Sequence, residues 1–234
     1  MKTDILTTEV IDEIAVVKLG SPKKMYFDMA MGDALTEELQ AFAGDPHVRV
    51  VIITGGTPGY FNRHFDIPAL IDIAEQIRAS GRQWPDSATY HGGFFDKAMA
   101  ICETMPKPVL AAISGTALAG AFEFTLACDI RIAEDGDYLI GLPETELGLL
   151  PGASGTQRLP RTVGIASALW HILMGKPLVR VRPKPRVSST KRSRAKPSIA
   201  RWRLQSICRN IRRNRPLTLS VLSAAPTKRL WRMG

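Results

Sequence analysis

Two glutamates in apolar surroundings are the side chains of this 234-residue chain best suited to acid–base chemistry. Glu123 lies between Phe122 and Phe124, where an ionised carboxylate would lose hydration, so we expect a raised pKa unless hydrogen bonds hold the charge. Glu144 lies in a glycine-rich, apolar loop, with Glu146 as its rival. Two simpler interpretations stay open on pattern alone: Glu123 as an acid that favours a helix dipole, and Glu144 as an ordinary loop acid.

Small residues just before Glu123 suggest a second chemical feature. They let the backbone turn tightly from a strand into a helix at about Ala119. Main-chain N–H groups around Gly120 then lie at the positive end of that helix, where they suit an oxygen that develops negative charge. The pattern therefore predicts an oxyanion site next to a carboxylate.

The sequence lacks the motifs that several other kinds of chemistry require. No G-x-G occurs, the Gly-Lys pair at 175–176 precedes a proline, and no serine lies in G-x-S-x-G. The four histidines have no metal-ligand spacing, so we expect no metal. The three cysteines are too few and too scattered for a disulfide framework, which favours a reducing compartment. The first twenty residues have no targeting pattern, and the longest apolar stretch, 109–122, is too broken to span a bilayer. We expect a soluble, cytoplasmic protein without membrane contact.

The strands and helices that position these residues can be predicted from the sequence pattern. Apolar, β-branched runs predict strands, and amphipathic or small-residue runs predict helices between them. Strands that alternate with helices indicate an α/β fold in which helices cover the sheet. The predicted strands are 14–19, 48–54, 109–113 and 129–133, and the predicted helices are 33–42, 94–105 and about 119–127.

Three segments together resemble the enoyl-CoA hydratase/isomerase (crotonase) family. They are Val50-Val-Ile-Ile-Thr-Gly-Gly56, Ala117-Leu-Ala-Gly-Ala-Phe-Glu123 and Leu150-Pro-Gly-Ala-Ser-Gly-Thr-Gln-Arg-Leu-Pro-Arg161, and the similarity runs from about residue 14 to 175. The resemblance implies a spiral of β-β-α units with two roughly perpendicular sheets and surrounding helices. It also implies assembly as a homotrimer or hexamer.

The resemblance gives the two glutamates their roles. The family's first catalytic glutamate falls on Glu123 and its second on Glu144. A pair at these positions resembles a hydratase, in which the carboxylates hold one water, one taking its proton as it attacks C3 of an enoyl-CoA and the other supplying a proton at C2. The implied function is enoyl-CoA hydration, as in fatty-acid or aromatic acid degradation. CoA is part of the substrate and no further cofactor is implied. Alternatives are an isomerase, a CoA-thioester lyase, or an inactive truncated fold with a nucleic-acid-binding tail.

The same resemblance places two main-chain donors for the thioester oxygen. One is the N–H of Gly120, and the other, from the loop at 59–67, is the N–H of Phe65. This loop departs from the family pattern because residues 62–65 replace small ones, and we expect that bulk to reshape the acyl pocket. His64 is a candidate third acid or base, with a packed or solvent-facing histidine as the alternative.

Three further residues are candidates for substrate binding. Lys24 lies where relatives carry a basic turn near the CoA nucleotide, and Arg63 is a candidate for a CoA phosphate. For both, a solvated side chain is the simpler alternative. Asp66 matches the acid that follows the family's oxyanion residue, and we expect it to orient this loop.

Charge divides the chain in two. Residues 176–234 contain 5 Lys and 13 Arg without any Asp or Glu, a charge of +18, whereas residues 1–175 carry −9. We therefore predict a crotonase-like catalytic core at 1–175 and a basic, acid-free tail at 176–234. Our hypothesis for the tail is a reading frame that slips after Leu178. The competing hypothesis is a genuine arm that binds nucleic acid or an anionic surface non-specifically and in a salt-sensitive way.

Overall fold

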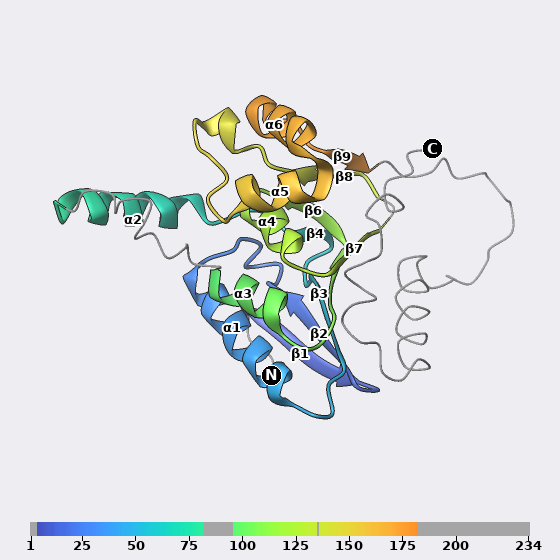
Figure 1. Ribbon diagram of the computed structural model, residues 1–234. Helices are drawn as coiled ribbons and strands as arrows, with labels where there is room; N and C mark the ends of the chain where they lie inside the picture. The colour runs from blue at the N-terminus through green and yellow to red at the C-terminus, as the bar shows by residue number, and fades with distance from the viewer. Residues whose placement is uncertain (1–3, 82–95, 135, 182–234) are drawn as a thin grey trace, which may run out of the picture.

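A strand–strand–helix order repeats along the chain of the computed structural model, which describes residues 4–81, 96–134 and 136–181 (Figure 1). The basic segment 182–234 lies outside the described residues. The strands are β1 (Leu6–Ile11), β2 (Ile14–Leu19), β3 (Val50–Gly55), β4 (Gly59–Asn62), β5 (Val109–Ile113), β6 (Gly115–Leu118), β7 (Ile130–Ala133), β8 (Tyr138–Gly141) and β9 (Val179–Val181). The helices are α1 (Met29–Gly44), α2 (Ile67–Ala79), α3 (Asp96–Thr104), α4 (Gly120–Leu126), the 3-10 turn η1 (Glu144–Leu147), α5 (Gly155–Val163) and α6 (Ile165–Met174).

From β3 to β8, successive strands alternate between two sheets. The first sheet has the order β1-β2-β3-β5-β7 and the second has the order β4-β6-β8-β9. Only the outer pairs, β1 with β2 and β8 with β9, are antiparallel in the described chain. Each pair β3–β4, β5–β6 and β7–β8 therefore gives one strand to each sheet before the chain enters a helix. This confirms the predicted α/β fold built from β-β-α turns.

The first sheet buries one face of each central strand in the main core. Val51 and Ile53 of β3 join that core, whereas Val50 and Ile52 form a smaller cluster on the opposite face with Leu110. This alternation follows from the two-residue period of a strand. Helices α1 and α3 pack together beside the first sheet, and α5 contacts both α4 and α6 beside the second (Figure 1).

Close backbone packing positions the turn that begins α4. Gly115 of β6 approaches β4 so closely that a Cβ there would lie 2.0 Å from the carbonyl carbon of Gly59. After β6 the chain turns through Ala119, whose φ of 52° is rare for a residue with a side chain. The N–H of Ala119 donates to the Gly141 carbonyl at 2.9 Å. The tight strand-to-helix turn expected before Gly120 is therefore present.

The described chain continues past Gly175 into the second sheet, where β9 pairs with β8. Helix α2 carries no buried residue and projects from the rest of the molecule (Figure 1). No described helix is both long and apolar enough to cross a membrane.

Candidate active site

Glu123 is a buried carboxylate held by two peptide N–H groups. It lies in the first turn of α4 and is 2% exposed. Its Oε1 accepts hydrogen bonds from the N–H groups of Ala153 at 2.9 Å and Gly155 at 2.6 Å. Burial raises the pKa of Glu123 to about 7, while these two bonds and the Arg158 charge oppose the rise. The carboxyl group can therefore change protonation state near neutral pH.

Glu144 is buried without such support. It opens the 3-10 turn η1 and is 8% exposed, and neither of its carboxyl oxygens has a hydrogen-bond partner among the described residues. Burial is the main reason that the pKa of Glu144 rises to about 8, and the negative charge of Glu123 raises it further. The two carboxyl groups are thus close enough to influence each other's charge.

The two glutamates come from different turns of the spiral. Glu123 follows β6 on α4, and Glu144 follows β8, the next strand in the second sheet. Strands β6 and β8 are parallel neighbours, so the segments that leave their carboxyl ends lie at the same edge of the sheet. This topology explains how residues 21 positions apart in sequence share one buried environment.

Gly120 places a main-chain donor at the start of the helix that carries Glu123. It is the first residue of α4, and the first N–H groups of a helix have no partner inside that helix. Helix α4 has seven residues, so the local peptide groups rather than a long helix dipole supply the positive charge.

Phe65 lies in a loop that main-chain hydrogen bonds join to segment 25–27 on one side and to the end of β6 on the other. The loop pairs with segment 25–27 through three main-chain bonds: Arg63 N to Met25 O at 2.9 Å, Phe27 N to His64 O at 2.9 Å, and Asp66 N to Phe27 O at 2.7 Å. The Leu118 N–H donates to the Arg63 carbonyl at 3.2 Å, which joins the loop to the end of β6. The predicted second donor thus lies in a loop tied to the strand that leads to Gly120.

Arg63 and His64, both on this loop, contact neighbouring tyrosine side chains. Arg63 donates to the hydroxyl of Tyr26 at 3.0 Å and lies over the rings of Tyr26 and Tyr60, at 5.7 and 6.0 Å from their centroids. The His64 ring packs against Tyr26, and its Nδ1 lies 2.6 Å from the Phe65 carbonyl oxygen. Arg63 and His64 are each half-buried, and the ring contact of His64 with Tyr26 fits the packed histidine of the simpler interpretation.

Lys24 and Asp66 have partners within the described chain. The ammonium group of Lys24 pairs with Asp28 at 2.5 Å, and Asp28 also caps α1 by accepting from the Met31 N–H. Asp66 precedes α2, where its carbonyl accepts from the Leu70 N–H, but its side chain makes no capping bond. Lys24 is therefore held close to the start of α1, and Asp66 fixes its loop through main-chain atoms.

Sequence reasoning missed the donors that hold Glu123. Ala153 and Gly155 lie in the segment Leu150–Arg161 that carries the family resemblance, but their N–H groups were given no role. Gly155 approaches the glutamate so closely that a Cβ there would lie 2.7 Å from Oε1. The glycine three residues before Arg158 was the available signal.

No group of three or more His, Cys, Asp or Glu side chains in the described ranges could hold a metal ion. The candidate site residues comprise two carboxyl groups, peptide donors and a basic cluster with aromatic neighbours.

Comparisons with known proteins agree with this architecture. The family model described as enoyl-CoA hydratase/isomerase matches residues 9–180. The fatty acid oxidation complex subunit alpha of Shewanella putrefaciens is 36% identical over 176 residues, which are 74% of this chain and 23% of that subunit. The crystal structure of an enoyl-CoA hydratase from Bacillus anthracis is 31% identical with a TM-score of 0.63, and the match covers 74% of this chain and 63% of that one.

The chain belongs to the enoyl-CoA hydratase/isomerase family, because the family model covers most of it. A structure of DspI from Pseudomonas aeruginosa, 26% identical, matches with a TM-score of 0.70 over 92% of this chain and 78% of that one. The chain spans less than two thirds of the length of the oxidation-complex subunit and of the Bacillus anthracis hydratase.

Proposed function

We propose that this chain is an enoyl-CoA hydratase, which adds water across the 2,3 double bond of an enoyl-CoA thioester. The observation that carries the proposal is the pair of buried carboxyl groups, Glu123 and Glu144, with pKa values raised to about 7 and about 8. A catalytic acid and base work best when their pKa values lie near the working pH. Membership of the family and the enoyl-CoA hydratase among its structural relatives support the same substrate class.

The surroundings of the two groups assign the proton transfers. Glu123 has the lower pKa and two N–H donors that stabilise its ionised form, so it acts as the base that takes a proton from water. Glu144 has the higher pKa, and no N–H group of another described residue donates to its carboxyl oxygens, so it acts as the acid. Water oxygen bonds to C3, the π bond breaks, and Glu144 delivers a proton to C2.

The negative charge that forms on the thioester oxygen needs donors placed in advance. The N–H groups of Gly120 and Phe65 are our proposal for these donors, and each one is worth about 3 to 4 kcal/mol of barrier lowering in such sites. Arg63 and Lys24 are proposed contacts for the CoA phosphates, and Asp66 is proposed to orient the loop between them. No cofactor beyond the CoA of the substrate enters the scheme, and we propose a homotrimer or hexamer as the assembly.

Isotopic labelling tests the reaction class. Crotonyl-CoA incubated with the protein in labelled water should gain one oxygen-18 at C3 and one deuterium at C2, because hydration takes both from solvent. Mass spectrometry and proton NMR of the product report both positions. Conversion without oxygen-18 would indicate double-bond isomerisation, and release of a shortened thioester would indicate a lyase; either result contradicts the hydratase proposal.

The acid-free run 176–234, which contains 18 basic residues, favours a second candidate function, non-specific binding of nucleic acid. That binding would be compatible with the catalytic proposal, because the run lies almost entirely beyond the described core.

A further inference from the structure

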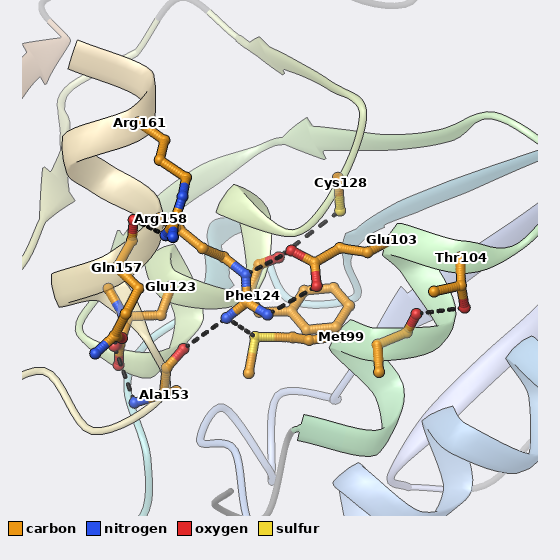
Figure 2. Close-up of polar contacts among 12 residues, drawn as sticks. Met99, Glu103, Thr104, Glu123, Phe124, Cys128, Ala153, Gln157, Arg158 and Arg161 are labelled. Atoms are coloured by element: carbon orange, nitrogen blue, oxygen red, sulfur yellow. Dashed lines mark hydrogen bonds and ion pairs between the residues drawn. The ribbon is translucent and has the colours of Figure 1, made fainter. Parts of the chain in front are cut away.

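An ion pair between Arg158 and Glu103 is linked to the segment that holds Glu123 through a hydrogen bond from Arg158 to Ala153 (Figure 2). Arg158 of α5 donates from Nε to Oε1 of Glu103 at 2.7 Å and from Nη2 to Oε2 at 3.0 Å. The Arg158 side chain is 16% exposed, whereas that of Glu103, on α3, is 44% exposed. Two parallel bonds between a planar guanidinium and a carboxylate fix orientation as well as distance. The pair therefore sets where the third nitrogen of Arg158 points.

That third nitrogen reaches the Glu123 segment. Nη1 of Arg158 donates to the Ala153 carbonyl at 3.2 Å and lies 3.6 Å from the sulfur of Met99. The N–H of the same Ala153 donates to Glu123 at 2.9 Å (Figure 2). One residue thus receives a hydrogen bond from Arg158 and gives one to the proposed base.

The segment needs such support because its backbone is unfavourable. Ser154, between the two donors, has φ 69° and ψ 20°, the left-handed conformation that costs a residue with a side chain about 1 to 2 kcal/mol. Strained residues persist where surrounding contacts over-determine them. The turn donates to Glu123 on one side and accepts from the Arg158 side chain on the other, and the Ser154 carbonyl accepts from the N–H groups of Gln157 and Arg158 at the start of α5.

We propose that the Glu103–Arg158 pair is a positioning device for Glu123, fixing the 153–155 turn whose two N–H groups hold its carboxylate. The inference rests on the proposed function, in which Glu123 is the base. Arg158 touches no reacting atom in this scheme; it acts through Ala153. Its charge also favours the ionised form of Glu123, in the same direction as the two hydrogen bonds.

Titration of Glu123 itself provides the test. In protein labelled with carbon-13 at the glutamate carboxyl groups, the Glu123 signal is assigned by its loss in Glu123→Gln and then followed with pH. Arg158→Met should raise the pKa of Glu123 by about one unit, because both the charge and the geometry of the donors are lost. Arg158→Lys keeps the charge without the planar fork, so a smaller rise is expected. Arg161→Met is the matched control, because Arg161 is an exposed residue of the same helix whose side chain donates to the Gln157 carbonyl and not to the 153–155 turn.

The variant Glu103→Ala distinguishes a positioning effect of the ion pair from a purely electrostatic effect on the pKa of Glu123. Removing a negative charge would lower the pKa of Glu123 if charge alone mattered, whereas releasing Arg158 from its fixed geometry should raise it. For hydration, both variants should lower kcat about tenfold or more with little change in KM, because the pair touches no substrate.

An unchanged pKa of Glu123 in Arg158→Met, or a lowered one in Glu103→Ala, would overturn the proposal. If Arg158→Met does not fold, Glu103→Ala carries the test, since the Glu103 side chain is 44% exposed and its removal leaves no buried cavity. The NMR readout does not depend on turnover. A protein that fails to hydrate crotonyl-CoA but shows these shifts would therefore contradict the proposed function and not the positioning of Glu123.

Discussion

Glu123 and Glu144 reach raised pKa values in different environments. Both lose solvation, but only Glu123 gains two peptide donors and a nearby guanidinium in return. Glu144 has none of these and also feels the charge of Glu123. Two like groups whose surroundings separate their pKa values form an acid–base pair, since one stays ionised while the other stays protonated.

The unpartnered Glu144 should cost stability at high pH. Its pKa in the folded protein, about 8, is above the ordinary 4.5, so the folded state favours the neutral form. Its contribution to stability is full below pH 4.5, falls progressively above that pH and is lost as the pH rises through 8. Glu144→Gln removes the buried charge, and we expect its Tm at pH 9 to exceed that of the parent by about 3 °C or more, with a smaller difference at pH 6.

Calorimetry at both pH values measures this difference. Glu146→Gln is the control, because Glu146 lies on the same turn but is exposed and paired with Lys176 at 3.0 Å. That variant should show no gain at either pH. Equal Tm changes of Glu144→Gln at pH 6 and pH 9 would contradict the buried, unpartnered state of the carboxyl group.

The sequence identified the two glutamates but not the groups that tune them. Glu123 between two phenylalanines signals burial, and burial raises the pKa of a carboxyl group. The opposing donors Ala153 and Gly155 act through peptide N–H groups, which every residue possesses, so no side-chain pattern marks them. Arg158 was equally hidden, because its partner Glu103 is 55 positions away.

At the scale of elements, the site is made by strand ends and by the start of α5. Several strands and helices were predicted within a few residues: 14–19 coincides with β2, 109–113 with β5, and 94–105 contains α3. Strand β1 and helices α2, α5 and α6 were not assigned a predicted range. The short strands β4, β6 and β8 were missed. Each has four residues, and Gly115–Leu118 consists mainly of small residues, too few to show a two-residue period. Their place in a sheet is decided by neighbours distant in sequence.

The first residue of α5 must be glycine for Glu123 to sit where it does. A Cβ on Gly155 would lie 2.7 Å from Oε1 and 3.0 Å from Cγ of Glu123. Gly155→Ala should therefore displace the carboxylate and lower kcat by about tenfold to a hundredfold, since misplacement by an ångström has effects of this size.

Steady-state kinetics with crotonyl-CoA measure that effect. Gly152→Ala is the matched control, because a Cβ at Gly152 meets only the Leu150 carbonyl oxygen at 3.9 Å and the residue does not have a positive φ. We expect near-parental kcat in this variant. Equal activity of the two alanine variants would show that the close approach of α5 does not matter.

At the scale of the whole molecule, the part of the chain that matches the family is followed by a segment of opposite net charge. Residues 1–175 carry −9 and residues 176–234 carry +18, and the family match ends at residue 180. Near that end, α6 exposes Ile165, Trp170 and Leu173, each more than half accessible. Exposed apolar side chains gathered on one helix commonly mark a surface that is covered by another chain or segment. This surface is consistent with our proposal of a homo-oligomer.

The pH dependence of kcat/KM for crotonyl-CoA tests the central claim most directly. The parent chain should give a bell-shaped profile, falling below about pH 7 as Glu123 is protonated and above about pH 8 as Glu144 ionises. Glu123→Gln and Glu144→Gln should each lower kcat by at least about a hundredfold. The residual activity should lose the acidic limb in the first variant and the basic limb in the second. Full hydratase activity in both variants, or an unchanged bell in either, would contradict the account.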